Sequence, residues 1–342
     1  MEEKKRWVFI DILNIISCFA VVFVHCNFRS YNFDNTIEWR LSLMVEFLLL
    51  YAVPVFIMIS GATLLNYRER YDTIHFFKKR ISRVVIPFII WSIIYYILKN
   101  KNLNIINFTK SFLNGNIEGV FWFFPTIIYL YCLIPIFSLI IKEKEHRKVM
   151  WAIVIWIFVF QSTLIPICKI MGISFPALFI DAKAQHPYIM FLLLGYLIST
   201  SNNIEKRKRI LIYILGILAF IFRYVFTVLM SVHNNELVDI FFSKYEYFPN
   251  VFQAVAVFVF IKQIDWDRIL SDKTKRFVKK LSSLSFGIYL THMLAISLLK
   301  RIFGLELTDL AYRTIFPIIV YAVCAIGSYI IKKIPVLKKI VP

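Results

Sequence analysis

The apolar segment of residues 10–28 carries a carboxylate, Asp11, an amide, Asn14, and an imidazole, His25. A carboxylate, an amide and an imidazole can bind a substrate or move a proton. At about 100° per residue, these side chains and Cys18 fall within roughly 60° of one another on a helix. Asp11 and His25 are about 21 Å apart along its axis, which excludes a triad that pairs them directly. The pattern predicts one polar wall of a passage.

Two other interpretations of this segment stay open. In the simpler one, His25 caps the outer end of the helix and Asp11 pairs with Arg6. In the other, Cys26 is a nucleophile, although adjacent residues point about 100° apart on a helix, so Cys26 and His25 would face different ways. The five cysteines have no disulfide-framework or zinc spacing, so we expect neither a disulfide framework nor a metal site.

A basic stretch, "FFKKRISRVVIPF", precedes a later apolar segment and contains Arg80 and Arg83. Three residues apart, these side chains share one face of a helix. Arginine suits phosphate because its planar guanidinium donates two parallel hydrogen bonds. We therefore expect a phosphate-binding pair at the cytoplasmic surface. The alternative is that this charge only sets the membrane orientation.

Four further residues are candidates for substrate binding or for structural roles. His292 lies mid-segment with Tyr289 three residues before it, and an ionisable side chain at membrane depth is a functional candidate by default. Arg223, also mid-segment, needs an anionic partner or a wet cavity. Trp122 lies near the outer boundary, where a place in the aromatic belt is the simpler interpretation.

The composition indicates that membrane-spanning segments position these residues. The 342 residues are 59% hydrophobic and only 18% charged, which is typical of a polytopic membrane protein. The net charge of +19 lies in short clusters between apolar segments, which argues against nucleic-acid binding. No nucleotide-binding loop, zinc-protease motif or nucleophile elbow is present.

We expect an all-α fold with about ten transmembrane helices in a single domain, residues 1–342. The alternating loops predicted to be cytoplasmic hold 27 of the 40 Lys and Arg residues and the opposite loops hold 10, so both termini should be cytoplasmic. The segments at 84–98 and 187–201 are short for a crossing of about 20 residues. The ten predicted segments are 7–27, 41–66, 84–98, 120–141, 149–168, 187–201, 210–231, 249–264, 282–300 and 311–331.

From about residue 6 to about residue 331, the order and spacing of several motifs resemble one known family. It is the integral-membrane acyltransferase 3 family, the ten-helix O-acyltransferases of surface polysaccharides and lipid-linked sugars. After the early Asp and His, the motifs are "VPVFIMISG", "KKRISR" before "IPF", "WFFPTIIYLYCLIP", "FLLLGYLI" and "LSSLSFGIYLTHM".

The resemblance implies an acyl-CoA donor, usually acetyl-CoA, on the cytoplasmic side, no bound cofactor, and a carbohydrate hydroxyl as acceptor. It implies that His25 is the essential histidine, with Asp11 as the first-helix acid and Arg80 and Arg83 as the pair serving acyl-CoA. Many members carry Arg three residues after that Asp, where this chain has Asn14. Asn14 can hydrogen-bond a donor group but cannot neutralise phosphate.

As the function, we expect transfer of an acyl group, with acetyl as the first candidate, in a bacterial plasma membrane, with His25 as general base or transient acyl carrier. A transporter or exporter of sugars or glycan precursors is the alternative from another class, although the sequence shows no repeat of the kind common in transporters. A structural subunit without activity is the third possibility, and it predicts that His25 is dispensable.

Overall fold

The computed structural model describes residues 7–100, 103–141, 145–173, 186–307 and 309–342. Within these ranges all regular secondary structure is helical, which confirms the predicted all-α class. The main helices are α1 (Val8–His25), α2 (Ile37–Leu49), α3 (Ala52–Leu64), α4 (Thr73–Arg80), α5 (Ile86–Lys99), α7 (Phe123–Ile140), α8 (His146–Ile157), α10 (His186–Ser199), α11 (Lys206–Asn234), α12 (Phe248–Gln263), α15 (Ser285–Phe303) and α17 (Phe316–Lys333).

Shorter helices join these or extend them. They are η1 (Phe28–Tyr31), η2 (Leu65–Glu69), η3 (Ile81–Val85), α6 (Ile105–Leu113), η4 (Gly119–Trp122), η5 (Phe158–Leu164), α9 (Ile165–Ile170), α13 (Trp266–Ile269), α14 (Asp272–Ser282), α16 (Leu310–Thr314) and η7 (Leu337–Lys339). Of these, η3 and η5 are π-helical turns and the other η elements are 3₁₀ turns.

Eight helical stretches of the described residues are long and apolar enough to cross a membrane, so the chain is a multi-pass membrane protein. Two further apolar helices are shorter: Pro187–Ser199 and Phe248–Gln263. Together these ten coincide with the ten predicted segments. The helix at 187–199 is as short as the sequence indicates.

The predicted span at 41–66 is not one straight helix but α2 followed by α3, with a break at Leu50 and Tyr51. The cause is local. Pro54 lacks the N–H that would bond the carbonyl of residue 50, and its ring clashes with that carbonyl in a regular helix. The break brings residues of both helices, Leu49 and Ala52 among them, to the same cavity.

The predicted segment at 84–98 proves longer, because α4, η3 and α5 form one continuous helical stretch, Thr73–Lys99. Both arginines belong to this helical stretch, since Arg80 ends α4 and Arg83 lies in η3. Pro87 cannot donate to the carbonyl of residue 83, and the π-helical turn immediately before it absorbs this missing bond.

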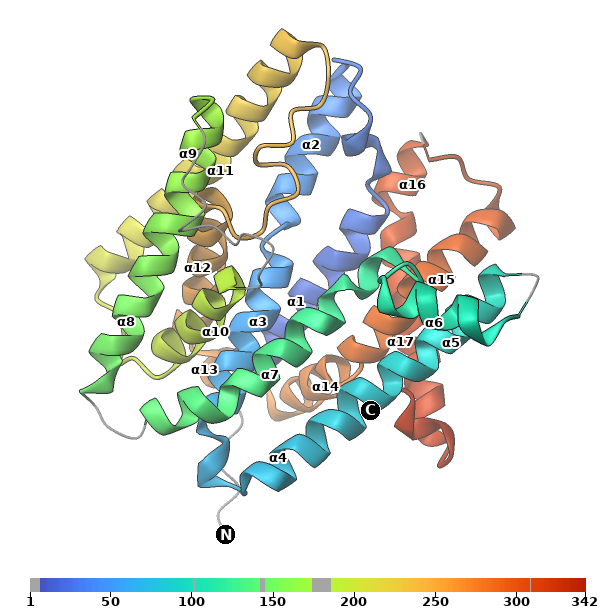
Figure 1. The fold of residues 1–342 in the computed structure, drawn as a ribbon, viewed down its shortest axis with the longest axis horizontal. Coiled ribbons are helices and arrows are strands. Elements are labelled where there is room, and N and C mark those ends of the chain that lie inside the picture. The colour runs from blue at the N-terminus through green and yellow to red at the C-terminus, as the bar shows by residue number, and fades with distance from the viewer. Residues whose placement is uncertain (1–6, 101–102, 142–144, 174–185, 308) are drawn as a thin grey trace.

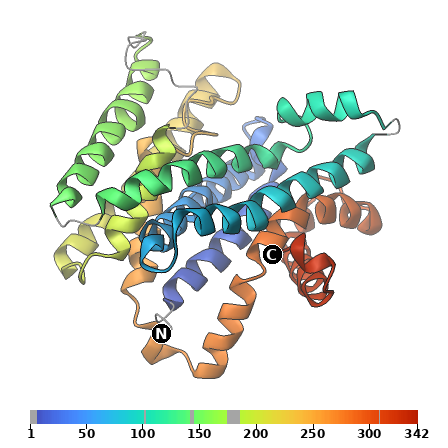
Figure 2. The same cartoon turned by 60° about the horizontal axis from the view of Figure 1, so that its bottom comes forward.

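The first helix lies in the middle of the molecule, between α8, α9 and α11 on one side and α15 and α17 on the other (Figure 1). It contacts α3, α12, α14, α15 and α17. Beside it, α3 and α10 pack so closely that a Cβ atom on Gly61 or Gly195 would overlap a backbone carbonyl of the other helix. A second view shows α4 and α5 crossing the bundle diagonally beside α7 (Figure 2).

Candidate active site

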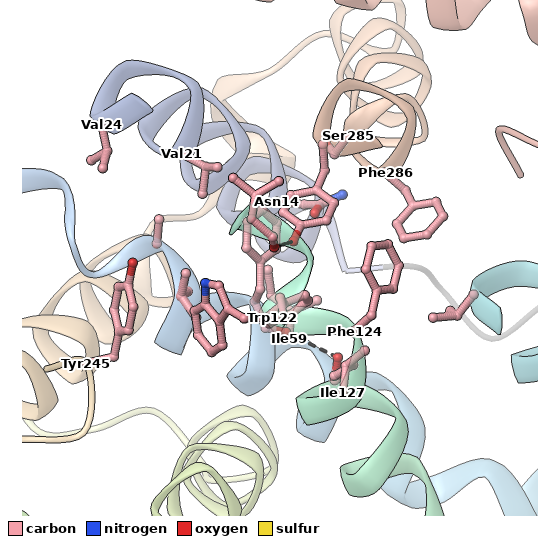
Figure 3. Close-up of a pocket in the computed structure, with 18 of the residues that line it drawn as sticks. Asn14, Val21, Val24, Ile59, Trp122, Phe124, Ile127, Tyr245, Ser285 and Phe286 are labelled. Atoms are coloured by element: carbon pink, nitrogen blue, oxygen red, sulfur yellow. Dashed lines mark hydrogen bonds between the residues drawn. The ribbon is translucent and has the colours of Figure 1, made fainter. Parts of the chain in front are cut away.

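A cavity of about 250 Å³ lies along α1, lined by Asn14 near its start and by His25 at its end. These two residues are about 16 Å apart along the helix axis. The other walls come from α2 and α3, η3, η4 and α7, the junction of α14 and α15, and the loop before α12 (Figure 3). None of the described lining residues is Asp, Glu, Lys or Arg.

The polar stripe of α1 divides between this cavity and the protein interior. Asn14 lines the cavity and donates from Nδ2 to the carbonyl oxygen of Ser282 at 2.9 Å and to its hydroxyl at 3.0 Å, which ties α1 to the end of α14. Asp11 is 3% exposed and Cys18 is 2% exposed, and neither lines the cavity. Arg6 lies outside the described residues, so its pairing with Asp11 stays a prediction.

The end of α1 places His25 against His292 of α15, with ring centroids 5.2 Å apart. His25 is half-buried and faces the cavity, whereas His292 is fully buried behind it. Tyr289 lines the cavity one helical turn before His292, and its hydroxyl donates to the carbonyl oxygen of Val120. Of the predicted residues, His25, Tyr289 and His292 therefore meet at one end of the cavity, whereas Asn14 lines it about 16 Å away along α1.

Trp122 also lines the cavity, where its ring stacks on that of Tyr245 with centroids 5.5 Å apart. The two lie side by side in Figure 3, away from Ser285 and Phe286. Burial, with Glu46 nearby, raises the pKa of Tyr245, so its hydroxyl stays protonated and can donate at neutral pH. The sequence gives no signal for Tyr245, which lies in a loop without periodic pattern.

Cationic side chains gather where α1 begins, just outside the cavity. The guanidinium of Arg80 lies 5.6 Å from the ring centroid of Tyr131, which lines the cavity. Lys332 donates from Nζ to the carbonyl oxygen of Ser283, another lining residue, at 2.5 Å. Arg80 is half-buried but Arg83 is exposed, so the two predicted partners do not share one environment. Arg83 lies within the π-helical turn Ile81–Val85, where side-chain directions differ from those of the α-helix that ends at Arg80.

Among the described residues, the guanidinium of Arg223 hydrogen-bonds only neutral acceptors, and Arg223 does not line this cavity, so the anionic partner or wet cavity expected for it stays a prediction. It is 1% exposed and donates from Nε to the carbonyl oxygen of Phe241 at 3.0 Å, and from Nη2 to that of Phe242 at 3.0 Å. Nη1 donates to Oδ1 of Asn250 at 3.3 Å, and the guanidinium lies over the ring of Phe47. Its role is to hold the loop that carries Tyr245.

A buried carboxylate that the sequence interpretation missed is Glu46, 1% exposed on α2. It accepts hydrogen bonds from Nδ2 of Asn27 at 2.9 Å, from Oγ of Ser30 at 3.3 Å and from the hydroxyl of Tyr31 at 3.4 Å. A lone acid in an apolar span is the signal that could have identified it. Cys26, in contrast, is fully buried in an apolar cluster and does not line the cavity.

Comparison with known proteins gives one match that covers nearly the whole chain. A family model described as an acyltransferase domain matches residues 7–332. Among curated proteins and solved structures, no match was found.

Proposed function

We propose that this chain, which belongs to the acyltransferase family whose model matches residues 7–332, moves an acyl group such as acetyl from acyl-CoA to a carbohydrate hydroxyl. The observation that carries the proposal is the cavity along α1. It joins an imidazole, His25, to a margin of cationic side chains near Asn14. We further propose that the protein lies in a bacterial plasma membrane and that the cationic margin faces the cytoplasm.

The size and charge of the cavity support a donor with two parts. At about 250 Å³ it is smaller than typical small-molecule sites of about 300–1,000 Å³, so it holds one small moiety and not a whole nucleotide-containing donor. Its uncharged walls suit the acyl group and the thioester arm of acyl-CoA. Arg80, Arg83 and Lys332 lie outside, where cationic donors can bind the phosphates.

At the other end, His25 is the general base. Its unprotonated ring nitrogen takes the proton of the acceptor hydroxyl while that oxygen attacks the thioester carbonyl carbon. The carbon–oxygen bond forms, the carbon–sulfur bond breaks, and the imidazolium returns the proton to the leaving thiolate. The products are an ester and free CoA, and His25 ends in its starting state.

The acceptor binds against the aromatic pair of Trp122 and Tyr245. Stacked rings give a flat apolar surface, while the Tyr245 hydroxyl can hydrogen-bond a sugar oxygen. Such a surface suits a pyranose ring, which has apolar C–H faces and polar hydroxyl groups at its edge. This end of the cavity also contains His25, so an acceptor hydroxyl placed here is within reach of the base.

The test follows acyl-labelled acyl-CoA into base-labile ester, with membranes that contain the protein and the glycan extracted from its host. We expect wild-type membranes to form ester and His25→Ala to form about 10²–10⁴-fold less, since this is the usual contribution of a general base. His233→Ala is the matched control, because this exposed histidine at the end of α11 does not line the cavity. It should keep wild-type activity.

Three results would contradict parts of the proposal. Ester formed equally by His25→Ala would remove His25 from the chemistry. Label that stays on wild-type protein and is lost with His25→Ala would replace the general base by an acyl carrier. No ester from folded wild type with several acyl donors would reject the enzyme and direct the work to transport assays with sugar precursors.

A further inference from the structure

The histidine behind His25 has a defined hydrogen-bonding state. Nδ1 of His292 lies 2.6 Å from the carbonyl oxygen of Tyr289. A carbonyl oxygen can only accept, so Nδ1 carries the proton and donates it. In the neutral ring, Nε2 is then a lone-pair acceptor. His292 is fully buried, and Nε2 has no hydrogen-bond partner among the described residues.

An acceptor that is buried without a donor destabilises a protein, so its presence needs a reason. The ring that faces it is His25, with centroids 5.2 Å apart and ring planes 37° from each other. At this spacing, a modest rotation of the His25 ring brings one of its nitrogens to hydrogen-bond distance from Nε2 of His292. The donor that Nε2 lacks is therefore on the adjacent ring.

The turn that carries His292 is fixed from outside its own helix. The hydroxyl of Tyr95 on α5 donates to the carbonyl oxygen of Leu290 at 3.0 Å and accepts from the backbone N–H of Leu294 at 3.2 Å. These two contacts lie on either side of His292 along α15. The hydrogen bond at Nδ1 thus holds the ring in one rotamer, and the two Tyr95 contacts hold the backbone of this turn in place. A residue fixed in this way can orient a neighbouring side chain.

We propose that His292 is the positioning residue of the catalytic base: its Nε2 accepts a hydrogen bond from the ring N–H of His25. This inference rests on the proposed acyl transfer and on His25 as its base. The bond holds the proton of neutral His25 on the nitrogen away from the cavity, so the other nitrogen presents its lone pair to the acceptor hydroxyl. When that nitrogen takes the hydroxyl proton, the N–H toward His292 becomes charge-assisted and stronger. His292 itself gains and loses no proton.

The first test uses two substitutions to decide whether His292 acts as a hydrogen-bond acceptor or only fills space beside His25. His292→Phe keeps the ring but removes the acceptor, and it should lower kcat about 10–100-fold, as when a partner that orients a functional histidine is lost. KM for acyl-CoA should stay within about twofold, because the donor phosphates bind elsewhere. His292→Gln carries an oxygen near the position of Nε2 and should recover at least a third of wild-type kcat. His233→Phe, with an exposed ring, is the matched control and should equal wild type.

A Phe variant with wild-type kcat, or a Gln variant as slow as the Phe variant at equal thermal stability, would overturn the inference. In both cases, activity of wild type and its loss in His25→Ala would leave the proposed function standing. Absence of ester from wild type would instead reject the proposed function itself. The two failures are thus distinguishable.

A second measurement does not depend on the folding of a variant at position 292. Nitrogen-15 spectra of wild-type protein labelled at histidine report which ring nitrogen carries the proton. The chain has six histidines, so replacing each of the other five in turn assigns the remaining signal to His292. We expect His292 protonated at Nδ1 and unprotonated at Nε2. A proton on Nε2 would overturn the inference, because that nitrogen could then no longer accept from His25.

Discussion

Arg223 shows how one buried charge can support the wall of a cavity that it does not line. Its guanidinium donates to the carbonyl oxygens of Phe241 and Phe242 and to Oδ1 of Asn250. The loop held in this way continues directly to Tyr245, which stacks on Trp122 in the cavity. A planar group with five donors suits three converging acceptors, whereas a lysine could satisfy only part of them.

We predict that Arg223→Leu lowers the free energy of unfolding by about 2–4 kcal/mol, since it leaves three buried acceptors without donors. Arg223→Lys should be intermediate, because one ammonium group can restore some of these bonds. Thermal unfolding of the purified protein in detergent measures both effects.

The exposed residue Arg301, at the end of α15, supplies the control. Arg301→Leu removes the same charge from a solvated position and should leave the unfolding temperature within error of wild type. An equal loss for Arg301→Leu and Arg223→Leu would show that net charge, and not the buried hydrogen bonds, determines the effect.

The side chains of α1 show how far a helical wheel can predict a site. The wheel gathers Asp11, Asn14, Cys18 and His25 into one sector, and the structure places only Asn14 and His25 on the cavity. A sector of roughly 60° is wide enough to meet two different neighbours. Cys18 meets the carbonyl of Ser285 on α15, a partner that no property of α1 alone could reveal.

At the scale of elements, the packing of α3 against α10 depends on two glycines. A Cβ on Gly61 would overlap the carbonyl oxygen of Leu192, and one on Gly195 would overlap that of Met58. Small residues let helix backbones approach in a bilayer, where apolar side chains gain little by leaving lipid. Because α3 also lines the cavity, this contact sets the position of one cavity wall.

We predict that Gly61→Ala and Gly195→Ala each lower the free energy of unfolding by about 1–3 kcal/mol through overpacking. Gly327→Ala on α17 is the control, because its Cβ meets no atom within 4 Å. That change should be neutral or stabilise the helix by up to about 1 kcal/mol. Titration with a denaturing detergent measures all three, and a loss as large at Gly327 would contradict the packing argument.

Prolines explain where predicted elements and observed ones differ. The sequence contains Pro54, Pro87 and Pro166, each of which leaves the carbonyl four residues earlier without its usual donor. The chain responds with a break before Pro54 but with π-helical turns before Pro87 and Pro166. Proline marks the irregular turn, but tertiary packing selects its form. The separate environments of Arg80 and Arg83 therefore could not be predicted from their spacing.

For the whole molecule, hydropathy predicts the number and rough extent of the helices but not which of them meet. Lipid-facing and protein-facing apolar surfaces are alike in composition, so only packing decides the neighbours. Asn14 bonds Ser282, 268 residues away, and Trp122 stacks on Tyr245. From a single sequence, the order of the motifs predicts the family and makes His25 a candidate. The contact between His25 and His292 can be seen only in the folded structure.

Contacts between loops favour ten crossings over eight, although α10 has 14 residues and α12 has 16. Such helices are about 21 and 24 Å long, less than the roughly 30 Å hydrocarbon core. Arg147 at the start of α8 donates to Thr200 just after α10 at 2.9 Å, so those two helix ends lie together. The rings of Tyr31 and Phe242 are 4.9 Å apart, so the segment after α1 lies with the segment after α11. We therefore predict that each short helix connects opposite faces.

This arrangement predicts which loops an impermeant thiol reagent reaches in intact cells. With ten crossings and cytoplasmic termini, Glu236→Cys should be labelled from outside and Asn203→Cys only after the membrane is opened. If α10 and α12 did not cross, the two results would exchange. The two labelling results would also exchange if there were ten crossings with the termini outside. In that case Lys339→Cys, near the C-terminus, would be labelled in intact cells. Cys132 and Cys168, the native thiols with exposure, are first changed to Ser so that only the new cysteine reacts.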